Sequence, residues 1–191
     1  MKHRIAGLLL ASLFTGSVQA SGVDFRLGSR TAEFNYLTES ATFGYGGADM
    51  GFGVFIDEED SVLGTGSILV SGSSDGDVRG LQLGVGVKAY VGTLETPNDD
   101  SGGGLALGGQ IRYVLPSSKP IAFVLEGWAV PEVVSVADFD GITEWRIGVE
   151  LEVTPSARGY IGYRVLEVDL DVTGTEIELD DRAHVGVKFA F

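Results

Sequence analysis

The sequence predicts an all-β protein, an antiparallel up-and-down transmembrane β-barrel of about ten strands, with about eight strands as the alternative. Three observations predict it: strand-like segments that alternate in polarity, aromatic residues that close the last segment, and an N-terminus typical of exported proteins. The closing segment is the clearest, because Val185, Val187, Phe189 and Phe191 fall on one face of a strand. Apolar side chains that face lipid and polar ones that face the lumen are typical of bacterial outer-membrane barrels.

The N-terminal 20 residues have the pattern of a signal peptide. Basic residues at 2–4 precede a short apolar stretch at 5–14, and small residues lead to a predicted cleavage between Ala20 and Ser21. The apolar stretch is shorter than the roughly 20 residues that a membrane-spanning helix needs. We therefore expect residues 1–20 to be a signal peptide and residues 21–191 to form the barrel domain, integral to the outer membrane of a Gram-negative bacterium.

Ten strand-like segments follow one another along the chain. They cover approximately 22–28, 30–38, 48–57, 62–72, 78–92, 103–115, 120–131, 142–154, 158–172 and 176–191. Several are about 11–15 residues long, which exceeds the usual 5–6 of soluble sheets and suits a tilted membrane span. A soluble β-sandwich would give the same alternation with its apolar faces turned inward, and it is the main alternative fold.

The connections between these segments predict an orientation. If the C-terminus is periplasmic, one side receives three short connections rich in turn-forming residues: 72–77, 116–120 and 154–157. The other side receives connections that are mostly longer and carry many acidic residues: 57–60, 92–102, 131–141 and a hairpin from 167 to 181. Short periplasmic turns and longer outer loops are typical of outer-membrane barrels.

Aromatic residues and composition support the same class. Tyr113, Phe123, Phe189 and Phe191 lie near the predicted periplasmic ends of outward faces and Trp145 near an outer end, as in an interfacial girdle. The chain has no Cys, which excludes disulfides and thiolate chemistry. Its formal net charge of −14 argues against nucleic acid as a partner.

The polar faces of the segments predict a charged lumen. Its lining residues are Lys88, Gln110, Arg112, Glu126, Glu144, Arg146, Glu150, Glu152, Arg164, His184 and Lys188. Charge inside a narrow barrel must be paired or hydrated, because an unpaired buried charge is costly. We favour a ladder of ion pairs that plugs the lumen, with a narrow, selective pore as the alternative.

No residue pattern points to catalysis or to a cofactor. His184 is the only histidine after the predicted cleavage site, and the chain has no G-x-S-x-G motif. Glu150 and Glu152 share a face and could act as an acid–base pair, but the spacing alone is weak support. We expect no enzymatic activity, no cofactor and no defined metal site, and a barrel enzyme acting on lipid or polysaccharide is the less favoured alternative.

The expected partners follow from the membrane location. They are outer-membrane lipid and lipopolysaccharide, and the assembly machinery that inserts such barrels. The acidic loops suggest a solvated rim, where divalent cations could also bind oxygen ligands. We expect a structural or surface-interaction role and a monomer.

Several segments resemble one known family. They are Gly84–Tyr90, Gly103–Tyr113, Ala129–Ser135, Gly162–Arg164, and Leu179–Asp181 with the closing strand. In these segments the chain is similar to the YfaZ-type outer-membrane proteins of Gram-negative bacteria, firmly from about residue 78, whereas residues 40–60 are longer than the family pattern. The resemblance implies an outer-membrane barrel and supplies no catalytic residues.

Overall fold

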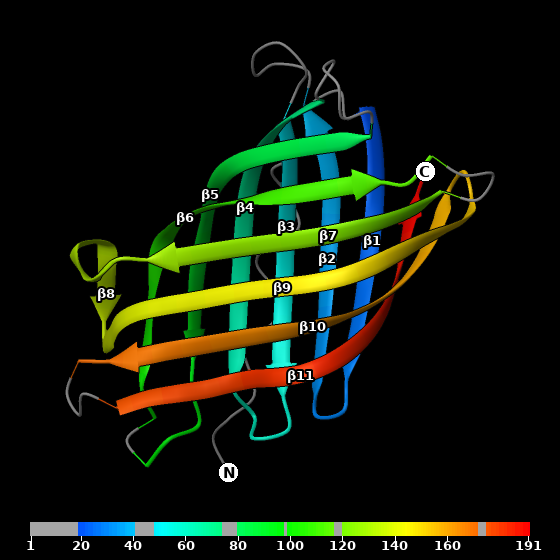
Figure 1. The fold of residues 1–191 in the computed structure, drawn as a ribbon. Coiled ribbons are helices and arrows are strands. Elements are labelled where there is room, and N and C mark those ends of the chain that lie inside the picture. Colours follow the sequence, from blue (N-terminus) through cyan, green and yellow to red (C-terminus); the bar gives the residue numbers. More distant parts are fainter. Residues whose placement is uncertain (1–18, 41–47, 74–79, 98, 117–119, 172–174) are drawn as a thin grey trace.

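The computed structural model describes residues 19–40, 48–73, 80–97, 99–116, 120–171 and 175–191, and in them ten long antiparallel strands form a closed barrel (Figure 1). The strands are β1 (Gln19–Gly28), β2 (Thr31–Ser40), β3 (Ala48–Asp57), β4 (Val62–Ser73), β5 (Leu81–Thr93), β6 (Ser101–Val114), β7 (Ile121–Val130), β9 (Phe139–Thr154), β10 (Ala157–Leu170) and β11 (Thr175–Ala190). Each pairs with the long strands before and after it, and β1 pairs with β11 to close the ring. The predicted ten-stranded, up-and-down barrel is confirmed.

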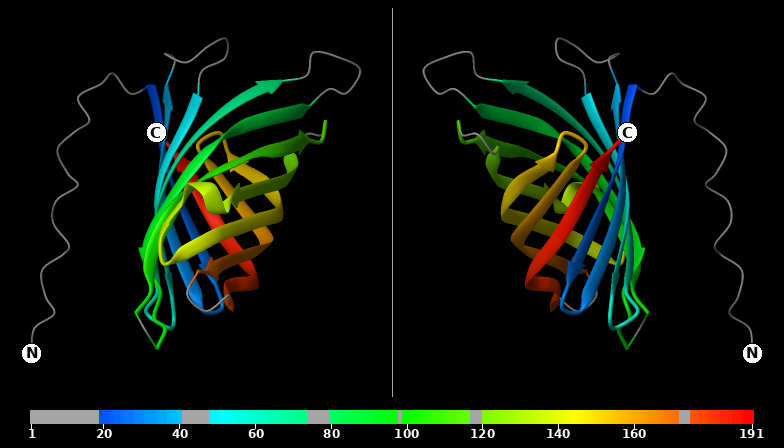
Figure 2. Two further views of the ribbon diagram at one scale, coloured as in Figure 1. Left: turned by 90° about the vertical axis from the view of Figure 1, so that its left-hand side faces the viewer. Right: turned by 90° about the vertical axis from the view of Figure 1, so that its right-hand side faces the viewer.

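The strands are strongly tilted around the barrel axis. In Figure 1, β2–β4 run up the back of the barrel while β7, β9, β10 and β11 cross its front diagonally, and Figure 2 shows the same wrapping from two sides. Such a tilt is a geometric requirement for closing a sheet into a barrel.

One short strand interrupts the regular pattern. After β7 the chain makes a 3₁₀ turn, η1 (Glu132–Val134), and then forms β8 (Ser135–Ala137), which pairs with Gly102–Gly104 of β6. The sequence predicted a connection over all of 131–141, so neither element was expected there, nor the start of β9 at Phe139. In the described residues, no helix is long and apolar enough to cross a membrane.

The barrel has two distinguishable ends. At the terminal end, Ser21 N donates to Phe191 O at 3.1 Å and Phe191 N donates to Ser21 O at 2.8 Å. The turn between β9 and β10 lies at the same end, whereas the connections after β1, β3, β5 and β10 lie at the distal end. Gln19, Ala20 and Ser21 belong to β1. The rest of the predicted signal peptide, residues 1–18, lies outside the described residues.

The predicted difference in loop length is wrong. Strands β10 and β11 extend to Leu170 and from Thr175, so most of the expected acidic hairpin from 167 to 181 is sheet. Likewise β5 reaches Thr93 and β6 begins at Ser101, which shortens the expected connection 92–102. In the hairpin, outward acidic residues such as Glu167 and Glu178 gave the stretch the composition of a loop, although inward positions such as Leu166 and Val168 are apolar and favour a strand.

The distal half of the interior is filled by apolar side chains. Together they form a hydrophobic cluster, named the distal cluster below. It comprises Phe55, Leu63, Tyr90, Leu94, Ala106, Trp128, Val130, Phe139, Ile142, Leu166, Val168, Leu170 and Leu179. Most of these positions lie toward the distal ends of their strands, so this half of the barrel is packed like the core of a soluble protein.

Candidate functional site

The barrel interior carries the polar residues that the sequence predicted for the lumen. Eight of the eleven line an interior cavity: Lys88, Gln110, Arg112, Glu126, Glu144, Arg146, Glu150 and Lys188. Arg164 and His184 do not line this cavity but are buried, with exposed fractions of 2% and 3%. Glu152 is partly exposed, and its Oε2 lies 3.7 Å from Arg158 Nε.

The cavity-lining charges are paired. Lys88 Nζ lies 2.5 Å from Glu144 Oε2, which also accepts a hydrogen bond from the Tyr90 hydroxyl at 2.6 Å. Arg146 forms an ion pair with Glu126, whose other oxygen accepts a hydrogen bond from Trp128 Nε1 at 2.7 Å. The first pair joins β5 to β9 across the interior, and the second joins direct partners on the neighbouring strands β7 and β9.

Glu150 is shared by two cations. Lys188 Nζ lies 2.6 Å from its Oε1 and Arg112 Nε lies 3.2 Å from its Oε2. Arg112 also donates from Nη1 to Gln82 Oε1 at 3.1 Å. The carboxylate of Glu150 is therefore held on both oxygens, and it is not paired with Glu152 as an acid–base couple would be.

Arg164 of β10 connects to carboxylates on two other strands, β11 and β2. Its Nη2 lies 2.7 Å from Asp180 Oδ2, and its Nη1 forms an ion pair with Glu33 of β2. Glu33 also accepts from Arg26 Nη1 at 2.6 Å, and Asp24 of β1 accepts from the Tyr160 hydroxyl at 2.5 Å. We call this group of paired interior residues the charged belt: Asp24, Arg26, Glu33, Lys88, Arg112, Glu126, Glu144, Arg146, Glu150, Arg164, Asp180 and Lys188.

Four members of the charged belt are not among the lumen residues that the sequence predicted. Asp24, Arg26 and Glu33 lie in the first two strands, where alternation is weakest. The partners Phe25 and Phe34 on the opposite face of β1 and β2 are the sequence feature that could have identified this inward face. Asp180 falls in the expected acidic hairpin, but it is buried against Arg164. A register shift after Leu166 leaves Leu179 as an extra residue in β11, and such a β-bulge changes which side chains point inward.

His184 is buried without a hydrogen bond from either ring nitrogen to another described residue. Its ring meets the ring of Tyr160 edge-on, with 5.9 Å between centroids. It lies against Gly162, where a Cβ would be only 2.8 Å from His184 Nε2, so the glycine makes room for the ring. The histidine therefore does not form a hydrogen-bonded pair with a nucleophile in the described part of the chain.

The interior cavity has a volume of about 870 Å³. Its lining includes Ser21, Pro155 and Ser156, so it extends to the terminal end. Of the distal cluster it reaches Trp128, whereas Phe55, Leu63 and Leu166 do not line it. The interior thus changes from a polar cavity through the charged belt to the apolar distal cluster.

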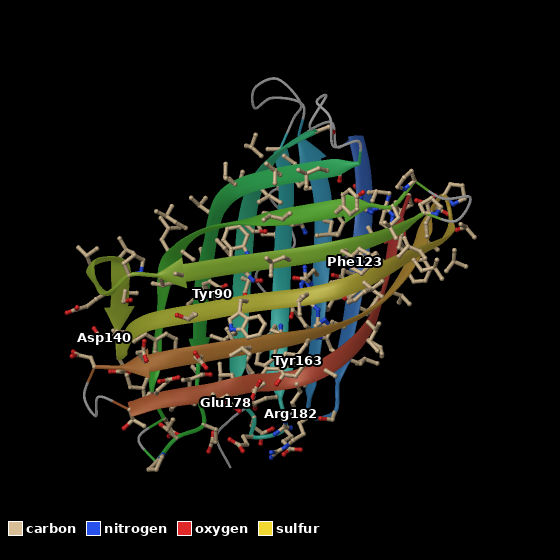
Figure 3. All side chains as sticks on the ribbon, in the orientation of Figure 1. Tyr90, Phe123, Asp140, Tyr163, Glu178 and Arg182 are labelled. Carbon is tan, nitrogen blue, oxygen red and sulfur yellow. The ribbon has the colours of Figure 1, made fainter. Side chains whose placement is uncertain are left out.

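The outward face changes in the opposite sense. Toward the terminal end, β10 and β11 present apolar residues such as Ile161, Val185 and Val187, all exposed. Toward the distal end, the same faces of the same strands present acids: Glu167, Asp169, Glu176, Glu178 and Asp181. In Figure 3, Phe123 lies toward the terminal end and Glu178 toward the distal end.

An aromatic pair lies where the outward face changes. The rings of Trp145 and Tyr163 are neighbours on β9 and β10, with 6.2 Å between centroids. The Tyr163 hydroxyl donates to the carboxylate of Asp181, so it marks the first position of the acidic surface. The predicted outward placement of Trp145, Phe123, Phe189 and Phe191 agrees with their exposure.

No metal centre is evident in the described ranges: they hold no group of three or more His, Asp and Glu side chains placed to bind a metal ion.

Comparison with known proteins gives one match. A family model described as YfaZ precursor matches residues 1–191. Neither a curated protein nor a solved structure matches the chain.

Proposed function

The chain belongs to the YfaZ precursor family, and from this membership and its barrel we propose that it is an integral outer-membrane protein with a closed interior. Its role is structural or lies in contacts at the cell surface, and it has no enzymatic activity. The observation that carries the proposal is the reversal of polarity on both faces of β10 and β11.

The reversal is what a bilayer boundary requires. Where lipid surrounds the barrel, the outward face must be apolar and the inside can be polar. Beyond the lipid, water surrounds the strands, so the outward face becomes acidic and the inside apolar, as in a soluble sheet. Trp145 and Tyr163 lie at this boundary, where amphipathic rings favour the headgroup level.

The dimensions of the apolar surface fit a membrane. From Phe189 to Asp181, β11 runs about 26 Å along the strand. At a tilt of about 40°, typical of closed barrels, this corresponds to about 20 Å along the barrel axis. The value is close to the apolar band of about 25 Å in outer-membrane barrels. We assign the terminal end to the periplasm and the acidic distal end to the outside.

The closed interior follows from the two obstacles along the axis. A solute that enters the cavity meets the charged belt, whose groups are already paired, and behind it the distal cluster. An ion would lose its hydration among apolar side chains there, which is costly. The geometry therefore supports a closed barrel over the narrow channel.

The two tryptophans of the chain test the membrane proposal separately from the barrel. Trp145 faces outward and Trp128 is buried inside. We expect the fluorescence of Trp128→Phe, which retains Trp145, to be strongly quenched in vesicles of lipids brominated near the headgroup. The Trp145→Phe protein, which retains Trp128, serves as the matched control and should be quenched weakly.

Two outcomes would contradict the proposal. One is equal quenching of both variants. The other is recovery of the protein in the soluble periplasmic fraction of cells, without a gel-mobility difference between boiled and unboiled samples.

A further inference from the structure

We infer that the interior cavity is a binding site for an uncharged oligosaccharide, entered from the terminal end. This inference requires the barrel but not its membrane location, which the proposed function adds. The volume of about 870 Å³ lies within the range of about 300–1,000 Å³ for small-molecule sites.

The cavity lies between two chemically different walls. On β7, β9 and β11, long charged side chains reach inward and are paired with one another. On β3 and β4, the inward residues next to the cavity include several small ones: a Cβ at Gly51 would lie 2.8 Å from Ser67 Oγ, and one at Gly53 would lie 2.7 Å from Thr65 Oγ1. The larger inward residues Phe55, Leu63 and Leu69 lie on either side of them along these strands. These hydroxyls lie close against the strand backbone, because glycine allows the approach. The open space of the barrel is therefore on this side.

The second wall offers unused hydrogen-bonding groups. The side chains of Thr65, Ser67 and Gln110 line the cavity and make no hydrogen bond to another described residue. Hydroxyl and amide groups of this kind both donate and accept. They match the hydroxyl groups of a sugar, which also do both.

The charges of the lining exclude a strongly charged ligand. Six basic and six acidic residues line the cavity, so their formal charges cancel. Glu150, Glu126 and Glu144 are each already paired with a cation. An added anion or cation would upset this balance of charge, and the oppositely charged groups of the lining are already paired. A neutral polar ligand leaves the balance unchanged. Trp128 also borders the cavity, and because only 5% of its surface is exposed it can report on the cavity without offering a broad surface to a sugar ring.

The experiment uses Trp128 as the reporter. The full chain carrying Trp145→Phe, refolded in detergent micelles, is titrated with maltotriose and with triacetylchitotriose, and calorimetry provides an independent readout. We expect a saturable change in fluorescence with at least one of these neutral sugars. A trimer of galacturonic acid and a trimer of glucosamine, of opposite charge, should bind at least tenfold more weakly.

Two substitutions on adjacent residues of β4 provide the matched control. Ser67 faces the cavity, and Ile68 lies on the outward face next to it. Ser67→Phe should weaken sugar binding at least tenfold, and Ile68→Phe should leave it unchanged. Thr65→Val replaces the hydroxyl with a methyl group of similar size and should weaken binding about threefold to tenfold. Because it changes little volume, it shows whether an effect of Ser67→Phe comes from misfolding.

The inference is overturned if neither neutral trisaccharide gives a saturable signal. It is also overturned if a charged trimer binds more tightly, or if Ser67→Phe and Ile68→Phe behave alike. Because the titration reads Trp128 in micelles and the brominated-lipid test reads Trp145 in vesicles, either proposal can fail while the other stands.

Discussion

Arg164 and Asp180 contact each other through two nitrogens of one guanidinium group: Nη2 lies 2.7 Å and Nε 2.9 Å from Asp180 Oδ2. Both residues are almost fully buried. The same guanidinium also pairs with Glu33 and lies 4.8 Å from the ring centre of Phe55. Arg164 therefore connects the charged belt to the distal cluster.

Removal of Arg164 should be strongly destabilising. In Arg164→Met, Glu33 loses one of its two cations and Asp180 loses its cation, and breaking a buried pair from one side costs about 3–5 kcal/mol. Adding Asp180→Leu should recover part of this loss, because it removes one of the stranded carboxylates. The measurement is urea-induced unfolding of the barrel in vesicles, followed by gel mobility.

The matched control is Arg158→Met, which removes the partly exposed partner of Glu152. An exposed pair contributes at most about 1 kcal/mol. Equal effects of the two substitutions would contradict the assignment of Arg164 as the central connection of the belt.

The polarity reversal predicts different effects of one substitution at two positions of β9. Val149 and Thr143 both point outward, but Thr143 pairs with Glu167 at the acidic level. Val149→Arg should cost about 2–4 kcal/mol if Val149 lies near the bilayer midplane. Thr143→Arg should be tolerated, because it adds a cation beside acids in water. Folding yield and stability in vesicles measure both, and similar costs at the two sites would place the boundary elsewhere.

The barrel could be predicted from the sequence because alternation is strong in most strands, as in Trp145 to Leu151 of β9. Alternation tells which side chains share a face, so Arg112, Arg146 and Glu150 could be assigned to the interior without a structure. It does not tell which residues meet across the barrel. That depends on register and shear, so the partners Glu33 and Asp180 of Arg164 could not be identified.

The reversal on β10 and β11 differs from the expected pattern for another physical reason. The prediction of a polar inside and an apolar outside holds only where lipid surrounds a strand. Beyond Tyr163 the polarity changes sign, and Leu166 and Val168 point inward while Glu167 and Asp169 point outward. At this point two apolar residues, Val165 and Leu166, follow each other on β10, and a bulge at Leu179 interrupts β11. Alternation on either side of this point predicts the strands, and its change of sign carries the position of the proposed membrane boundary.

The acidic outer surface should weaken the barrel at low salt. Glu167 and Glu178 are direct partners across β10 and β11, as are Asp169 and Glu176, and like charges directly opposite are destabilising. Glu178→Lys should raise the free energy of unfolding by about 0.2–1 kcal/mol. The gain should shrink in 1 M salt, where the Debye length is about 3 Å. A gain independent of salt would point to a packing effect instead.

The last prediction concerns the barrier to ions. If the distal cluster is the main seal, removing one pair of the charged belt leaves the barrel closed. We therefore expect near-zero conductance in planar bilayers for the wild type and for Arg146→Ala. Phe55 and Leu63 are direct partners on β3 and β4 and among the most buried side chains of the cluster. The double substitution Phe55→Ala with Leu63→Ala removes volume that the surrounding strands refill only in part, so it should give brief, fluctuating openings. If Arg146→Ala conducts and the double variant does not, the charged belt is the seal. Steady, ion-selective openings of the wild type would instead make the protein a channel.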